Sequence, residues 1–190
     1  MGENQSKHAV NFDILAKQTH FHKKLLLQWY DDFMTLCPSG GMTKAKFQLT
    51  FSEFFPTEDS FQLLDHIFNV FSESKNGLIN FLDFVRIVRI TSNGTPEEKL
   101  DLAFKLYDIN NDGIISKEDM LNVVKGIYRW REANERQYKK KAEFIINSVF
   151  EEFDKDNENK IYRDDFIQGF INKSDVVDRL TRINSLQKIN

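Results

Sequence analysis

The sequence predicts an all-α protein, and two observations support this fold class. Only three prolines and eight glycines occur among the 190 residues, so few positions interrupt a helix. Apolar side chains also recur at intervals of three and four residues, the spacing of one helix face, on both sides of several short polar segments. A chain of this length can fold as one large domain or as two small lobes.

The polar segments form an internal repeat of four members, each twelve residues long. They lie at 35–46, 72–83, 108–119 and 154–165, and the last interval is longer because of extra residues near 131–141. Helical apolar spacing precedes the last three segments and predicts their entering helices. Before the first segment Leu27, Tyr30 and Met34 keep this spacing, although Asp31 occupies the i+4 place. Apolar pairs four residues apart follow them and predict exiting helices: Phe47 and Phe51, Phe84 and Val88, Met120 and Val124, and Phe166 and Phe170.

The eighth position of every segment is apolar, which suits short strands that join two segments back to back. These residues are Met42, Ile79, Ile115 and Ile161. A helix, a twelve-residue loop and a second helix make up the EF-hand, and such units work in pairs. Thr95 begins a sequence typical of a capped helix start, so we place the third unit there. We therefore predict four EF-hands in two paired lobes, 1–94 and 95–174, followed by a helical tail at 175–190.

Two of the loops carry the hard oxygen ligands that calcium needs. An EF-hand loop supplies ligands from positions 1, 3, 5, 7, 9 and 12, with a main-chain carbonyl at position 7 and a sharp turn at position 6. Gly113 and Asn159 occupy the turns, and asparagine tolerates the left-handed conformation. The candidate ligands are Asp108, Asn110, Asp112, Ile114, Ser116 and Asp119 in the third loop, and Asp154, Asp156, Glu158, Lys160 and Asp165 in the fourth.

Both candidate loops end in aspartate, at Asp119 and Asp165, where calcium loops usually have a glutamate that gives two oxygens. The shorter side chain reaches less far toward the ion. Losing one ligating oxygen costs on the order of 1 to 3 kcal/mol, or roughly ten- to hundredfold in affinity, and favours Mg²⁺ over the larger Ca²⁺. Ca²⁺ remains the predicted cofactor because the rest of both loops follows the calcium-binding pattern, and Mg²⁺ is the alternative that the residues leave open.

The first two loops lack most of these ligands. Loop 72–83 has one carboxylate in a ligand position, Asp83, so we expect it to be silent or very weak. Its other side-chain positions hold Ser72, Ser74 and Asn76, with Gly77 at the turn. Loop 35–46 contains the rigid ring of Pro38 and places Lys46 where the bidentate acid belongs. We expect no metal there.

Several segments resemble the neuronal calcium sensor family, over nearly the whole chain. They are Met1-Gly2 with Ser6, Trp29-Tyr30, Cys37-Pro38-Ser39-Gly40, Phe54-Phe55-Pro56, Phe68-Asn69-Val70-Phe71, Glu98-Lys99-Leu100 and Ala103-Phe104-Lys105-Leu106-Tyr107-Asp108. The resemblance implies two lobes, a hydrophobic groove for a helical target, and often an N-myristoyl group that calcium exposes or hides. This chain departs from the family, which usually keeps an active second loop and ends its active loops in glutamate.

The N-terminus is open to two interpretations. Gly2 and Ser6 fit the simple myristoylation pattern, so Gly2 is the candidate lipidation site. Glu3, in contrast, resembles the residues that the transferase tends to refuse after the glycine. The alternative is an unmodified N-terminus.

Aromatic residues concentrate in the half that lacks metal ligands, because 12 of the 18 phenylalanines precede Thr95. Aromatic grooves accept amphipathic helices, so this half is predicted to bind a target. Most of these rings are expected in the core and a few in a groove. The candidate groove residues are Phe33, Phe47, Phe51, Phe54, Phe55, Phe68, Phe81 and Phe84. The tail from Asp175 to Ile189 has an apolar face that could cover the groove.

Composition and charge exclude other function classes. A net charge of -3, from 29 acidic and 26 basic residues, does not fit a nucleic-acid binder. The chain has no apolar stretch of membrane-spanning length and no secretory signal, so we expect it in the cytoplasm, and peripherally at membranes if Gly2 is lipidated. The histidines show no metal spacing with Cys37, and this cysteine precedes a proline, so we do not expect an enzyme.

The predicted function is that of a calcium sensor that couples metal binding in the third and fourth EF-hands to a target protein. The target class stays open among a channel, a cyclase, a kinase and another enzyme. Two alternatives remain at this stage. One is a constitutive regulatory subunit, and the other is a calcium or magnesium buffer with little opening on metal binding.

Overall fold

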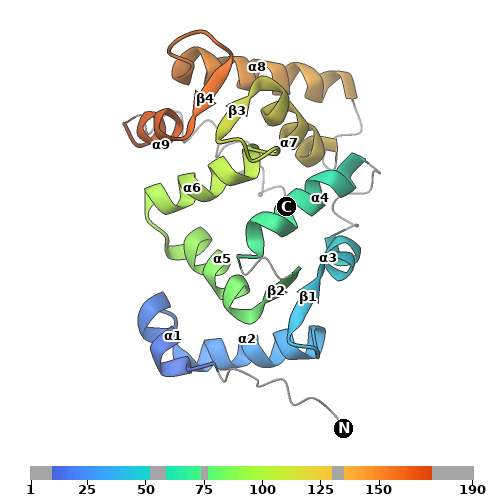
Figure 1. Cartoon of the computed structure of the whole chain (residues 1–190), viewed down its shortest axis with the longest axis vertical. Helices are drawn as coiled ribbons and strands as arrows, with labels where there is room; N and C mark the ends of the chain where they lie inside the picture. Colours follow the sequence, from blue (N-terminus) through green and yellow to red (C-terminus); the bar gives the residue numbers. More distant parts are fainter. Residues whose placement is uncertain (1–9, 52–58, 74–76, 130–134, 173–190) are drawn as a thin grey trace.

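The structure is a computed structural model that describes residues 10–51, 59–73, 77–129 and 135–172, and every structural statement below concerns these residues. Helices dominate and the strands are short, which confirms the predicted all-α fold (Figure 1). In chain order the elements are α1 (Phe12–Thr19), α2 (Lys23–Leu36), β1 (Gly41–Thr43), α3 (Lys44–Phe51), α4 (Asp59–Phe71), β2 (Leu78–Asn80), α5 (Phe81–Asn93), α6 (Pro96–Tyr107), β3 (Ile114–Ser116), α7 (Lys117–Arg129), α8 (Glu135–Phe153), β4 (Lys160–Tyr162) and α9 (Arg163–Asn172).

The strands join the loops in pairs, as the apolar eighth positions predict. β1 and β2 are antiparallel and bring Met42 opposite Ile79. β3 and β4 are antiparallel and bring Ile115 opposite Ile161, and both isoleucines are fully buried. The first loop is therefore tied to the second, and the third to the fourth.

Each strand pair lies beside its own hydrophobic cluster. One cluster draws on α1 to α5, and we call the described residues 10–93 the N-terminal half. The other draws on α6 to α9, and we call the described residues 96–172 the C-terminal half. Figure 1 shows α1 and α2 at one end of the longest axis and α8 and α9 at the other. Between the halves, α4 packs against α6 and α7, and α5 packs against α6.

The helix start predicted at Thr95 is the start of α6. Thr95 is the N-cap of α6, Pro96 is in the first turn, and the Thr95 and Glu98 side chains form a capping box. The extra residues of the last interval contribute to α8, which at 19 residues exceeds every other described helix. α1 was not anticipated; Asn11 caps it, and its Leu15 is buried in the N-terminal cluster.

None of the helices in the described part of the chain combines the length and apolar character needed to cross a membrane. The predicted lipidation site, Gly2, and the predicted tail at 175–190 lie outside the described residues.

Candidate functional site

The third loop begins at Asp108, which caps the C-terminus of α6 and is 5% exposed. Its two carboxylate oxygens accept hydrogen bonds from the main-chain N–H groups of Asp112, at 3.1 Å, and Gly113, at 2.9 Å. These bonds fold the loop around the carboxylate at position 1. Asp108 is thus held inside the loop, where an EF-hand needs its first ligand.

The side chains at positions 3 and 5 of this loop lie together. The Asn110 amide nitrogen donates to Asp112 Oδ2 over 2.9 Å, and Asp112 Oδ1 accepts from the Ile114 N–H at 2.9 Å. Asn111 and Gly113 adopt positive φ values of 57° and 83°, which turn the chain so that alternate side chains face the same region. The structure therefore brings the first three predicted ligands of this loop together.

Asp119 closes the third loop at position 12 and is 8% exposed. Its carboxylate accepts from the Ser116 N–H at 3.0 Å, while the Ser116 hydroxyl accepts from the Asp119 N–H at 3.1 Å. This reciprocal pair caps the start of α7. The loop supplies carboxylate, amide, hydroxyl and main-chain oxygens, so its donor set fits a hard divalent cation.

The fourth loop repeats this geometry at its start. Asp154 accepts from the N–H groups of Glu158, at 3.1 Å, and Asn159, at 2.9 Å. Asp156 also accepts from the Glu158 N–H, at 3.3 Å. Asn159 has a φ of 58°, the left-handed conformation predicted for it, and Asn157 has a φ of 60°. Asparagine thus replaces glycine at the turn without loss of the loop shape.

Two lysines of the fourth loop contact its acidic residues, and the sequence reasoning did not single out this contact. Lys155 at position 2 pairs with Asp165 at position 12. The Nζ atom of Lys160 lies 3.5 Å from Oε2 of Glu158. Within the described ranges, no three His, Cys, Asp or Glu side chains converge as a ready metal-ligand group. In the fourth loop, these two lysines occupy the carboxylates of Asp165 and Glu158. In the third loop, Asn110, Ser116 and main-chain oxygens complete the predicted set.

The first loop uses several of its ligand positions for contacts within the protein. Cys37 at position 3 is 2% exposed within the N-terminal cluster, and burial raises the pKa of its thiol. Gly40 makes the turn with a φ of 88°, and the hydroxyl of Thr43 caps α3 by accepting from the Lys46 N–H. The loop keeps the EF-hand shape while its ligand positions serve packing and capping.

The second loop is closed by protein groups at its two ends. The Ser72 hydroxyl donates to the Leu78 carbonyl, and the Asp83 carboxylate caps α5. Gly77 makes the turn with a φ of 76°. Ser74 and Asn76, two predicted weak ligand positions, lie outside the described residues.

The N-terminal half contains an apolar groove of about 440 Å³. Of the eight phenylalanines singled out from the sequence, four line it, while Phe68 and Phe81 are buried in the core and Phe54 and Phe55 lie outside the described residues. The prediction that a few rings line a groove is therefore supported for the described rings. The lining residues are Trp29, Asp32, Phe33, Leu36, Met42, Phe47, Thr50, Phe51, Phe71, Ile79, Phe84, Ile87 and Val88.

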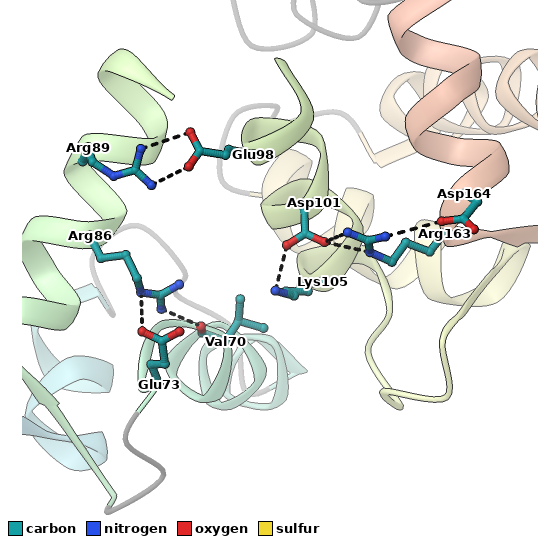
Figure 2. Close-up of polar contacts among 9 residues, drawn as sticks. All are labelled: Val70, Glu73, Arg86, Arg89, Glu98, Asp101, Lys105, Arg163 and Asp164. Carbon is teal, nitrogen blue, oxygen red and sulfur yellow. Dashed lines mark hydrogen bonds and ion pairs between the residues drawn. The ribbon is translucent and has the colours of Figure 1, made fainter. Parts of the chain in front are cut away.

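Helix α6 connects the N-terminal half, which contains this groove, to the C-terminal half, which contains the candidate metal loops (Figure 2). Arg89 of α5 donates two hydrogen bonds, of 2.7 and 3.0 Å, to Glu98 at the start of α6. Hydrogen bonds from Arg89 and from the Thr95 N–H lower the pKa of Glu98 to about 2. At the other end of α6, the His66 ring nitrogen Nε2 of α4 lies 2.9 Å from the Lys105 carbonyl.

The middle of α6 contacts the fourth loop. Arg163, at position 10 of that loop, donates from Nε to Asp101 over 2.8 Å, and Lys105 lies 2.8 Å from the same carboxylate. Burial raises the pKa of Asp101, but the hydrogen bonds from Lys105 and Arg163 outweigh it, so the pKa lies below its ordinary value. α6 therefore touches both candidate metal loops, because Asp108 begins the third loop at its end.

Comparisons with known proteins agree with this geometry. The family described as an EF-hand domain pair matches residues 97–180. Neuronal calcium sensor 1 from Lymnaea stagnalis is 33% identical over 190 residues, which cover 98% of this chain and 100% of the relative. S-modulin from Aquarana catesbeiana is 29% identical over 184 residues, which cover 93% of this chain and 91% of the relative.

Proposed function

The chain belongs to the neuronal calcium sensor family, and from this premise we propose that it binds calcium in its third and fourth EF-hands and thereby controls binding of a target helix in the N-terminal groove. We propose two lobes that divide at 94 and 95, with the tail at 175–190 as a separate element. The observation that carries the proposal is the separation of ligand-rich loops from the apolar groove, with α6 in contact with both halves.

The proposed metal ligands are the oxygens at positions 1, 3, 5, 7, 9 and 12 of loop 108–119, and at positions 1, 3, 5, 7 and 12 of loop 154–165. The convergence of Asp108, Asn110 and Asp112 supports the first site. When bound, the ion would supply the positive charge toward which these oxygens orient. Calcium is the proposed physiological ion, and magnesium is the proposed competitor because both loops end in aspartate.

The groove supports recognition of a helical partner because nearly all of its lining side chains are apolar and six carry aromatic rings. Trp29 and Phe84 meet edge to face, with ring centroids 6.0 Å apart, and Phe33 lies beside Phe84. Such walls accept apolar anchors at helical spacing. Asp32 at the groove favours a basic residue on the partner. We propose a protein target and no catalytic activity.

Calorimetry tests the metal sites. We expect calcium binding in the unaltered chain and its loss when Asp108→Ala is combined with Asp154→Ala. The matched control is Asp13→Ala, which removes an exposed acidic side chain on α1. Strong calcium binding that survives the double substitution would reject the assignment.

Target binding is tested by affinity capture in calcium and in chelator, with Val88→Asp as a variant that places a charge in the groove. We expect capture to depend on calcium and to fail in this variant. Truncation after Asn172 should raise capture in chelator if the tail covers the groove. Capture that is indifferent to calcium would instead favour a constitutive regulatory subunit.

A cytoplasmic location, with peripheral attachment to membranes through Gly2, completes the proposal. A single myristoyl chain gives only marginal, reversible attachment, so a second contact would be needed for stable anchoring. Mass spectrometry of the protein from its source cell tests the modification. A retained Met1 or an unmodified Gly2 would remove the lipid from the mechanism.

A further inference from the structure

The second EF-hand is closed by a hydrogen bond between two of its own ligand positions. Ser72 stands at position 1 and is 5% exposed. Its hydroxyl donates a 2.6 Å hydrogen bond to the main-chain carbonyl of Leu78 at position 7. Positions 1 and 7 are two that a metal ion joins in a binding loop. Here the serine joins them directly.

Asp83 connects the start of the same loop to the exiting helix. It stands at position 12 and is 4% exposed. Its carboxylate accepts from the Glu73 N–H at 3.2 Å and from the Asn80 N–H at 3.0 Å. Asn80 caps α5 by accepting from the Asp83 N–H at 3.0 Å. Asp83, which would coordinate a metal from position 12, therefore accepts hydrogen bonds from main-chain N–H groups near both ends of the loop.

Arg86 ties α5 to the end of α4 (Figure 2). One terminal nitrogen donates to the carbonyls of Phe71, at 3.2 Å, and Val70, at 3.5 Å. Its buried Nε lies 3.2 Å from Glu73 Oε2, an ion pair that is not aligned as a hydrogen bond. A cation at this position also complements the negative end of the α4 dipole. The guanidinium thus spans the two helices of the unit next to the loop.

We infer that Ser72, Asp83 and Arg86 hold the second EF-hand in one arrangement without metal, so that the groove stays formed at every calcium concentration. Part of the groove comes from this unit, because Phe71 lies at the end of α4 and Phe84 and Val88 lie on α5. The three side chains fix the relative placement of these walls. Calcium then acts on access to the groove rather than on its formation. The inference rests on the proposed function only in treating the groove as the target site.

Amide hydrogen exchange without any target tests this inference. The reporters are the amides of β2 and of the first turn of α5, followed in calcium and in chelator. We expect equal protection of these amides in both solutions in the chain that carries Asp108→Ala and Asp154→Ala. In the otherwise unaltered chain, Ser72→Ala and Arg86→Met should each speed their exchange by about tenfold, the effect of one buried hydrogen bond. The calcium stoichiometry of both variants should stay that of the unaltered chain.

Matched controls separate this role from general destabilisation. Arg89→Met removes an arginine one turn along α5 that bonds to α6 instead of α4. Ser148→Ala removes a hydroxyl that donates to a helix carbonyl in α8. Both should leave exchange in β2 unchanged. Equal effects of Arg86→Met and Arg89→Met would overturn the inference.

A second result would overturn it independently of the substitutions at Ser72 and Arg86. If the β2 amides lose protection in chelator and regain it when calcium is added to the chain with Asp108→Ala and Asp154→Ala, the second loop requires metal. This comparison still tests the inference in the case that the Ser72→Ala variant does not fold. Failure of the proposed function would give a different result. Target binding would then not depend on calcium, while the amides of β2 and α5 would remain protected from exchange.

Discussion

Lys155 provides the sharpest test of how the fourth loop binds its ion. This lysine pairs with Asp165, the residue proposed to close the site, so a metal must displace the ammonium group. Lys155→Met removes the competitor while it keeps an unbranched apolar chain of similar length. We expect calcium to bind the fourth loop more tightly in this variant.

The expected gain has two parts. The pair is a surface contact, with side chains 69% and 36% exposed, so breaking it costs about 0.2 to 1 kcal/mol. Removal of the repulsion between the lysine charge and a divalent ion in water-like surroundings adds about 1 kcal/mol. Together they correspond to an affinity increase of roughly eight- to thirtyfold. Salt screens both parts, so the gain should shrink at high ionic strength.

Calorimetric titration isolates this effect when the third loop is silenced by Asp108→Ala. The comparison needs low and high salt, and Lys99→Met serves as the control because Lys99 is an exposed lysine of α6 outside the loop. An unchanged affinity in Lys155→Met, or an equal gain in Lys99→Met, would refute the competition. A gain that does not depend on salt would also contradict the electrostatic argument.

Three further predictions concern calcium affinity, pH and packing. Asp119→Glu should raise the calcium affinity of the third loop by roughly ten- to hundredfold in calorimetry if the short acid limits the site. The lowered pKa of Glu98 means that its pairing with Arg89 contributes stability above the ordinary pKa of 4.5, and this contribution is lost as the pH falls toward about 2. The difference in melting temperature between the unaltered chain and Glu98→Gln should therefore shrink across that range, and a constant difference would contradict the pairing. Gly169→Ala should lower the melting temperature by the equivalent of about 1 to 3 kcal/mol despite its higher helix propensity, because the added carbon would lie 2.4 Å from the buried Phe153 ring.

The features that the sequence predicted are those set by local spacing. The pairing of Ile115 with Ile161 follows from the twelve-residue frame, and the capping of α6 by Thr95 follows from four consecutive residues. The left-handed Asn159 follows from its place at the turn. Each of these depends on neighbours within one loop or on two loops that share a register, so pattern alone can find it.

The features that the sequence did not reveal depend on tertiary contacts or on a choice between partners. Lys155 could have pointed into solvent, and only the folded loop brings it to Asp165. Ser72 at position 1 indicated a lost ligand but not the bond to the Leu78 carbonyl that replaces it. Arg86 belongs to no sequence motif, because it contacts main-chain oxygens of another helix and pairs with Glu73 in the loop. The sequence thus located the loops but not the side-chain contacts that hold the second loop together.

The proposed coupling between metal and target places specific demands on α6. Calcium can favour one arrangement of the chain only through contacts that differ between the two arrangements, and a target must then tighten calcium binding by the same factor. The second EF-hand is fixed by its own side chains under our inference, so the differing contacts must lie between the halves. The contacts of Glu98 with Arg89, and of the Lys105 carbonyl with His66, meet this requirement because they join α6 to α5 and α4. Asp101 extends the connection to the fourth loop through Arg163. Movement of α6 on metal binding would therefore change its contacts with α4 and α5, while the groove itself keeps its shape.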